Sequence, residues 1–288
     1  MLMQRVLTAI VLLLVLLGAL MAVSPWPLIV LLLLMAGCAL WEWLRLSLAP
    51  AWQPGAPWVA VFTTIFMFWL VWSWMPSTAP FGAAQQPEQL VHPWIILMAL
   101  AGWVMLAIPQ VLVGFTDTRR SNVALSVFGV LAVIAAWASL VLLYVEYGAW
   151  CLVSMMALIW FADIAAYFAG KAFGRRKLAP KVSPGKTWEG AIGGVLAAAA
   201  WTTATATLPG SFGAILAQQW SLPVVFLLAA LLAAFSITGD LFESLLKRRA
   251  GVKDSSRLLP GHGGVYDRID ALLPVAPVAA MLTGIVLQ

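Results

Sequence analysis

The chain has 288 residues, of which 63% are hydrophobic and only 9% are charged, and its formal net charge is +5. Soluble domains are about 45–50% apolar and about 25% charged. Because so little charge cannot cover a surface in water, the composition excludes a soluble enzyme, a secreted disulfide scaffold and a disordered chain. It predicts an all-α polytopic integral membrane protein, whose excess of Lys and Arg serves orientation, with no nucleic acid as partner.

Apolar stretches of about 18–23 residues follow one another along the chain, each bounded by Pro, Gly or charge. Each is long enough to cross a hydrocarbon core about 30 Å thick. The first stretch is longer than the apolar core of a usual signal peptide, so we expect it to be retained as a span. The sequence thus predicts about nine transmembrane helices, at residues 5–23, 26–46, 57–75, 93–114, 122–143, 149–170, 189–208, 221–241 and 270–287.

The positive charges predict the orientation of these helices. With nine spans, the two ends of the chain lie on opposite sides of the lipid bilayer. All 16 Lys and Arg residues then fall on the side of the N-terminus. Because positively charged loops remain in the cytoplasm, we expect a cytoplasmic N-terminus and a C-terminus on the opposite side.

The charged residues are concentrated in one part of the chain. Residues 163–270 hold 12 of the 16 cations and seven of the 11 acids. Orientation requires Lys and Arg but no acids, so this concentration indicates a functional site. We therefore divide the chain into N-terminal spans one to five, residues 1–145, and a catalytic region, residues 146–288, with cytoplasmic loops 171–188 and 243–268.

The densest cluster of charge follows the eighth predicted span. If that helix continues, Asp240, Glu243 and Lys247 share one face, because they are spaced i, i+3 and i+7. Asp267, at the start of the ninth span, would face Asp240 across a short loop. Two carboxylates and phosphate oxygens form a usual ligand set for Mg²⁺, so we expect Asp240 and Asp267 to be metal ligands. A second cation is compatible with the same site.

The loop between these carboxylates is rich in cations and glycine. The glycines on either side of His262 allow close backbone approach to a ligand. A solvated, orienting loop is the alternative, but it does not explain the acids in the same stretch, and for His262 alone a bystander role stays open. Four of the basic side chains provide enough charge to hold a polyphosphate: Lys247, Arg248, Lys253 and Arg257.

Two carboxyl groups fall inside predicted spans. Asp163 is costly there and therefore indicates a function, although a hydrogen bond with Tyr167 one turn on is an alternative. Glu42 lies near the end of the second span. We expect it to pair with Arg45, at i+3, at the membrane interface.

A second charged cluster precedes the seventh span. The run from Ser183 to Thr187 predicts a tight turn, with either of these residues as the N-cap of the following helix and Glu189 in its first turn. Free N–H groups at that end, with Lys186 beside them, suit an anionic ligand. The glycine spacing of a Walker A loop is missing.

The segment from Ser244 to Asp270 resembles the diagnostic segment of the phosphatidate cytidylyltransferases (CDP-diacylglycerol synthases). It contains Lys-Arg, Lys-Asp, a small residue, an aliphatic-Pro pair, His-Gly-Gly and Asp-Arg-x-Asp at the family's spacing. The Asp163 segment and the Ser183–Gly190 run are similar to that family too, so the resemblance covers roughly the C-terminal half. The matching positions of the diagnostic segment are Ser244, Lys247, Arg248, Lys253, Asp254, Ser256, Leu259, Pro260, His262, Gly263, Gly264, Asp267, Arg268 and Asp270.

The resemblance implies Mg²⁺-dependent transfer of a cytidylyl group from CTP to phosphatidic acid, which gives CDP-diacylglycerol and pyrophosphate in phospholipid biosynthesis. It also implies a homodimer in the inner membrane of a bacterium, with a polar cavity open to the cytoplasm. The expected catalytic residues are Asp240, Lys247, Arg248, Lys253, Asp254, His262, Asp267, Arg268 and Asp270. The expected substrate-binding residues are Asp163, Ser183, Lys186, Thr187, Glu189, Glu243 and Ser244.

Two other classes of protein would also carry cytoplasmic cations. A transporter with an anion-binding vestibule would spread its charges through several spans and show a pseudo-repeat, whereas here the charges cluster in two loops. Another lipid-phosphate transferase, such as a CDP-alcohol phosphotransferase, would carry a D-x-x-D-G-x-x-A-R core, which this chain lacks.

Overall fold

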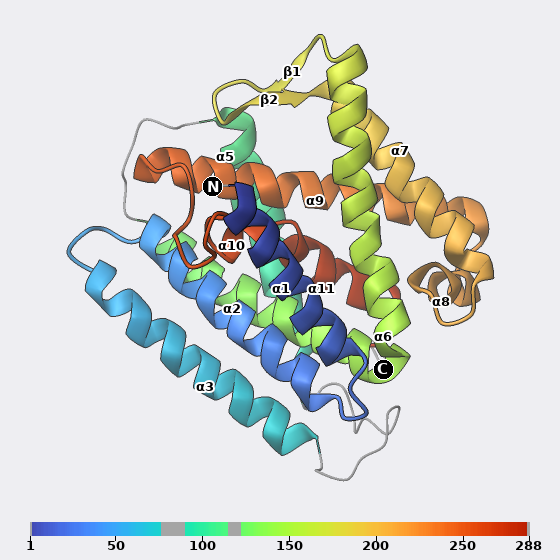
Figure 1. Ribbon diagram of the computed structural model, residues 1–288, viewed down its shortest axis with the longest axis horizontal. Helices are drawn as coiled ribbons and strands as arrows, with labels where there is room; N and C mark the ends of the chain where they lie inside the picture. Colours follow the sequence, from blue (N-terminus) through green and yellow to red (C-terminus); the bar gives the residue numbers. More distant parts are fainter. Residues whose placement is uncertain (1, 76–89, 115–121, 287–288) are drawn as a thin grey trace.

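The computed structural model describes residues 2–75, 90–114 and 122–286, which are almost entirely helical (Figure 1). The one departure from the predicted all-α class is a hairpin of two antiparallel strands, β1 (Lys177–Ala179) and β2 (Ser183–Thr187). The α-helices are α1 (Leu2–Leu20), α2 (Trp26–Ser47), α3 (Ala56–Trp74), α4 (Pro93–Gly102), α5 (Ile108–Val113), α6 (Val123–Phe173), α7 (Trp188–Ala204), α8 (Phe212–Gln219), α9 (Leu222–Ala250), α10 (Tyr266–Ile269) and α11 (Leu272–Leu282).

Several of these helices can cross a membrane. If α7 and α8, which are bent by 78° at their junction, count as one span, the described chain has six such segments. This supports the polytopic helical class, but the expected number of nine spans is not confirmed. The five that qualify singly are Trp26–Ser47, Gln53–Trp74, Pro93–Val113, Val123–Phe173 and Leu222–Ala250.

The smaller number has identifiable causes. The predicted spans 122–143 and 149–170 correspond to the two halves of α6, which counts as one segment although its backbone is not helical at Gly148. Helix α1, with 19 residues, covers most of the first predicted span but is not among the segments that qualify singly. The last predicted span forms only the 11-residue α11, which contains Pro277 and follows the short α10.

Helix α6 is the centre of the fold. It has 51 residues and is interrupted at Gly148, where φ is +82°, a conformation that a side chain would strain. Figure 1 shows its two halves running in different directions. Every residue from Ala132 to Val145 is buried, and α6 packs against α2, α4, α7 and α11. A segment that is apolar on all sides is expected at such a central position.

Helix α7 approaches the second half of α6 through glycines. A Cβ on Gly190 would lie 2.8 Å from the Ala166 carbonyl oxygen, and one on Gly194 would lie 2.6 Å from that of Ala162. Because only hydrogen fits at these positions, the two backbones lie close together, as small residues allow in membrane proteins. The hairpin that precedes α7 is thereby held beside the C-terminal end of α6 (Figure 1).

Gly194→Ala should lower the stability of the protein in detergent, because the new methyl group would lie 2.6 Å from the Ala162 carbonyl oxygen. Overpacking of this kind costs about 1–3 kcal/mol. Gly18→Ala is the matched control, since a Cβ there meets nothing within 4 Å. Thermal unfolding of both variants measures the effect, and an unchanged unfolding temperature for Gly194→Ala would contradict the close packing of α6 and α7.

Candidate active site

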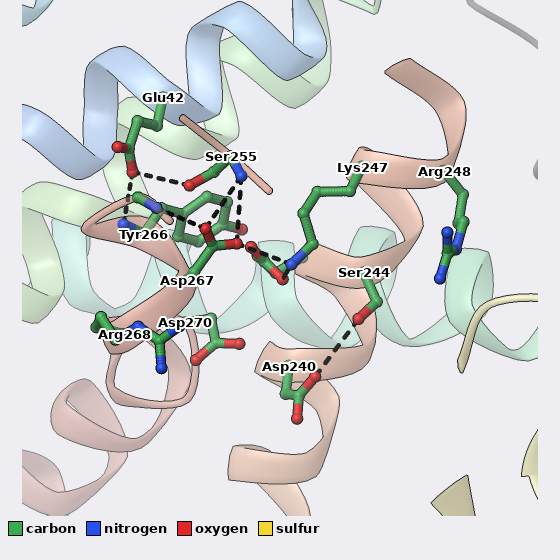
Figure 2. A network of polar contacts seen from close by, with 12 residues as sticks. Glu42, Asp240, Ser244, Lys247, Arg248, Ser255, Tyr266, Asp267, Arg268 and Asp270 are labelled. Atoms are coloured by element: carbon green, nitrogen blue, oxygen red, sulfur yellow. Dashed lines mark hydrogen bonds and ion pairs between the residues drawn. The ribbon is translucent and has the colours of Figure 1, made fainter. Parts of the chain in front are cut away.

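Helix α9 carries the first part of the charged cluster (Figure 2). Lys247 lies one turn after Glu243, with its Nζ atom 2.6 Å from Glu243 Oε2. One turn before Ser244 lies Asp240, whose Oδ1 atom is 3.5 Å from the Ser244 hydroxyl. The helix continues to Ala250 and ends at Gly251 in the left-handed conformation, so the predicted continuation of the eighth span is confirmed.

Lys247 connects α9 to the start of α10. Its Nζ atom also lies 2.8 Å from Asp267 Oδ1, so one ammonium group is shared by two carboxyl groups. The Glu243 side chain is 2% exposed and that of Asp267 is 6% exposed. Two carboxyl groups at this depth would be unfavourable without a partner of opposite charge, and Lys247 provides it.

Asp267 is held by backbone donors as well as by Lys247. Its Oδ2 atom accepts the N–H of Gly264 at 2.7 Å and that of Ser255 at 3.1 Å. Burial raises the pKa of Asp267, but hydrogen bonds with Glu243 and Lys247 and from the Gly264 N–H outweigh it and hold the pKa well below its usual range. Asp267 is therefore an ionised carboxylate in a fixed orientation.

A second ion pair joins the hairpin to α9. Lys186 of β2 bonds to Asp240 Oδ2, and this pair is more open to solvent, with side-chain exposures of 28% and 35%. Asp163 of α6 and Asp270, which follows α10, both interact electrostatically with Asp240. Three carboxyl groups therefore lie near the one ammonium group of Lys186, and burial together with the charge of Asp240 raises the pKa of Asp270 to about 8.

Asp240 and Asp267, the two expected metal ligands, lie in the same charged cluster but pair with different lysines, Lys186 and Lys247. Figure 2 shows Asp240 on α9 and Asp267 at the start of α10. In the part of the chain that the structure describes, no three His, Cys, Asp or Glu residues form a ready metal-binding group. Mg²⁺ commonly takes one or two carboxylates and completes its shell with water and substrate phosphates, so these donors fit it. The role of Asp240 and Asp267 as ligands stays a prediction.

Arg268 holds the glycine loop. Its Nη2 and Nε atoms donate to the His262 carbonyl oxygen at 2.6 and 3.2 Å. Gly261 and Gly263 have φ values of +77° and +83°, which turn the loop back so that Gly263 pairs with Leu259. The His262 Nδ1 atom is buried and has no hydrogen-bond partner among the described residues, so the imidazole nitrogen takes no part in holding the loop.

The hairpin is fastened at both ends. Thr187 Oγ1 accepts the Gly190 N–H at 3.2 Å, which confirms Thr187 as the N-cap of α7. The Glu189 carboxylate accepts the N–H of Arg175 at 3.1 Å and that of Arg176 at 3.3 Å, just before β1. Glu189 therefore stabilises the start of the hairpin. Ser183, the other candidate cap, instead begins β2.

Three further predicted residues come from the same segment as these ion pairs. Arg248 Nε donates to the Val182 carbonyl oxygen at 3.4 Å, which links α9 to the hairpin loop. Asp254 lies against Gly263, where a Cβ would be 3.4 Å from that of Asp254. Lys253 is exposed. Within the described chain none of the three forms an ion pair, so their charges are available to a ligand.

The expectation for Glu42 is wrong. Instead of pairing with Arg45 at the membrane interface, Glu42 is fully buried and bonds to the segment from Ser255 to Tyr266. Arg45 lies over the Trp41 ring, 4.8 Å from its centroid. A carboxyl group in an apolar span is itself a signal of function, for Glu42 as much as for Asp163. For Asp163, no hydrogen bond with Tyr167 is formed in the described chain.

The fold is that of a polytopic helical membrane protein, and its charged cluster is a candidate site for charged ligands. In a comparison with protein families, residues 3–286 match the cytidylyltransferase family. The phosphatidate cytidylyltransferase of Pseudomonas aeruginosa is 39% identical over 292 residues, which cover 98% of this chain and 97% of that protein. That of Haemophilus influenzae is 35% identical over 288 residues, or 96% of each chain. The chain therefore belongs to the cytidylyltransferase family.

Lys247→Met should destabilise the protein, because it leaves Glu243 and Asp267 buried without their shared partner. Removing one partner of a buried ion pair costs about 3–5 kcal/mol. Thermal unfolding in detergent measures the loss, and adding Glu243→Gln should recover part of it by removing one of the two carboxyl groups. The exposed Lys253→Met is the control; equal unfolding temperatures for Lys247→Met and Lys253→Met would contradict the shared bridge.

Proposed function

We propose that the chain is a phosphatidate cytidylyltransferase: it transfers the cytidylyl group of CTP to phosphatidic acid and releases pyrophosphate, in bacterial phospholipid biosynthesis. Near full-length similarity to relatives of that name supports this proposal. The observation that carries it is the arrangement of the 244–270 segment, in which Lys247 and Asp267 form an ion pair next to Asp240 and Lys186. Cations and carboxylates placed together suit two polyanionic substrates and a metal ion.

The reaction does not require the protein to form a covalent bond to either substrate. A phosphate oxygen of phosphatidic acid is already ionised at neutral pH, so it can attack the α-phosphorus of CTP directly. One P–O bond forms there while the bond to the leaving pyrophosphate breaks, with no covalent enzyme intermediate and no strong general base. The task of the chain is to hold both phosphates in line and to stabilise the charge that develops on the leaving group.

Basic residues from both loops would hold the phosphates. Lys186 belongs to β2, Arg248 bonds to the hairpin loop at Val182, and Lys253 is exposed nearby in sequence. A triphosphate offers Lys186 a stronger partner than Asp240 and would thereby free that carboxylate. Others would shape or line the binding surface: Asp163, Ser183, Thr187, Glu189, Glu243, Ser244, Asp254, His262, Arg268 and Asp270.

Mg²⁺, when bound, would neutralise triphosphate charge, and Asp240 and Asp267 are the residues proposed to hold it. Asp240 is the more accessible of the two, since its side chain is 35% exposed. Asp267 already accepts bonds from Lys247, Ser255 and Gly264. A carboxylate oxygen has two lone pairs, so we expect Asp267 to share them between these donors and the metal. A second cation would use the same carboxylates.

We infer that the site faces the cytoplasm, with nine crossings in the inner membrane and a homodimer as the assembled form. The cations gathered near the site support this orientation. A hydrogen bond 3.0 Å long from Thr8 Oγ1 to the Pro260 carbonyl oxygen also supports it, because this bond places α1, near the N-terminus, beside the charged loop. The C-terminal end of α11 lies beside the break in α6, because Tyr147 and Gln219 both donate hydrogen bonds to the Thr283 carbonyl oxygen.

Purified protein supplied with labelled CTP, phosphatidic acid and Mg²⁺ should form a CDP-lipid and pyrophosphate. Asp240→Asn and Asp267→Asn should each lose at least about 100-fold in kcat, since metal-assisted charge stabilisation is worth several kcal/mol. Glu146→Gln, at an exposed position of α6, is the matched control and should behave as wild type. If wild type forms no CDP-lipid, or if both Asn variants keep full activity, the proposal fails.

Reporter fusions test the orientation. A reporter that is active only in the cytoplasm should be active when fused to the N-terminus and inactive when fused after Gln288, because nine crossings place the two ends on opposite sides. Paired fusions with a reporter active only outside the cytoplasm should give the opposite pattern. Cytoplasmic activity of a fusion at Gln288 would contradict the odd number of crossings.

A further inference from the structure

Glu42 is the carboxyl group through which α2 contacts the segment that carries Asp267. Its side chain is fully buried. Oε1 accepts the N–H of Val265 at 3.1 Å and the hydroxyl of Ser256, while Oε2 accepts the N–H of Tyr266 at 2.6 Å and the hydroxyl of Ser255 at 3.0 Å. All four partners belong to one stretch of chain more than 200 residues away in sequence. Glu42 therefore forms its hydrogen bonds with that stretch and not with its own helix.

Ser255 links Glu42 to Asp267. Its hydroxyl bonds to Glu42, and its backbone N–H lies 3.1 Å from Asp267 Oδ2 and 3.3 Å from Oδ1. Figure 2 shows dashed lines from Ser255 to both carboxylates. If Ser255 were released by Glu42, its N–H could turn away from Asp267. The orientation of Asp267 therefore depends on a carboxylate that it does not touch.

Glu42 also replaces a cap that α10 lacks. This helix has four residues and no side-chain hydrogen bond of its own at the N-terminus. The first N–H groups of a helix have no partner within it, and a negative charge there is favourable. Glu42 accepts two of them, from Val265 and Tyr266. Because so short a helix is not stable alone, these bonds help to set where α10 begins and therefore where Asp267 lies.

Gly264 shows how tightly the arrangement is built. A Cβ at this position would lie 2.0 Å from Ser255 Oγ and 2.5 Å from Glu42 Oε1, so only glycine fits beside the two. The Gly264 N–H in turn donates to Asp267 Oδ2 at 2.7 Å. The second glycine of the His-Gly-Gly run is thus explained by contact with Glu42.

We propose that Glu42 is a positioning residue for the transfer reaction: it holds Ser255 and the start of α10 so that Asp267 keeps the orientation that the reaction requires. This rests on the proposed function, because it takes Asp267 as a catalytic residue. Glu42 does not touch substrate; it acts through Ser255 and through the backbone of Val265 and Tyr266.

Glu42→Gln is the sharpest test, because it keeps the shape of the side chain but replaces one oxygen with an NH₂ group that cannot accept a backbone N–H. We expect kcat to fall about 10–100-fold, as when a partner that orients a functional group is removed. The KM values for CTP and phosphatidic acid should change less than kcat. Glu146→Gln, exposed on α6, is the matched control and should keep wild-type kcat.

Amide hydrogen exchange provides a readout besides activity. In Glu42→Gln, exchange should become faster at Ser255 and from Gly264 to Tyr266, because their bonds to the two carboxylates weaken. Peptides from α6 and the apolar part of α9 should exchange as in wild type. Faster exchange throughout the chain would instead show general destabilisation and would overturn the proposal.

Ser255→Ala tests the link itself. It should lower kcat in the same way, and the double variant with Glu42→Gln should lose little more than Glu42→Gln alone, because the two residues act in series. Fully additive losses, or wild-type kcat in Glu42→Gln, would overturn the proposal. If Glu42→Gln does not fold, Ser255→Ala decides alone, and wild-type kcat in it is the contradicting result. Absence of CDP-lipid formation by wild type would instead refute the proposed function.

Discussion

The ammonium group of Lys247 joins α9 to α10, the two helices that carry most of the charged cluster. It lies 2.6 Å from Glu243 on α9 and 2.8 Å from Asp267 on α10. Without it, two buried carboxyl groups would lie together with no positive charge beside them. Because α10 has only four residues, its position follows from such contacts and not from its own helical stability. The orientation of Asp267, and of the glycine loop before it, therefore depends on α9.

The two ion pairs of the site differ in exposure, and the difference suits them to different tasks. Lys186 and Asp240 are 28% and 35% exposed, whereas Lys247 and Asp267 are 16% and 6% exposed. An ion pair in contact with water is worth little and exchanges partners readily. A polyphosphate can therefore compete for Lys186 at small cost, while Lys247 stays engaged. The outer pair is suited to ligand exchange and the inner pair to keeping the shape of the site.

Local rules predicted much of this molecule. Helical spacing explains the Glu243–Lys247 pair, and capping preference explains Thr187 at the start of α7. What could not be predicted depends on contacts distant in sequence or on backbone conformation. Glu42 bonds to residues more than 200 positions away, so Arg45, three positions on, appeared to be its partner. The break in α6 depends on the φ value of one residue, Gly148. Apolar composition cannot distinguish such a break from a loop between two spans.

The N-terminal half belongs to the construction of the site, although the diagnostic residues lie in the C-terminal half. The family match covers residues 3–286. Trp43, next to Glu42, packs its ring 5.2 Å from that of Tyr266 and 5.4 Å from that of Phe242 on α9. A fragment that began after residue 145 would lose this ring and the carboxylate beside it, leaving α10 without its cap. The diagnostic segment alone therefore cannot form a self-sufficient catalytic unit.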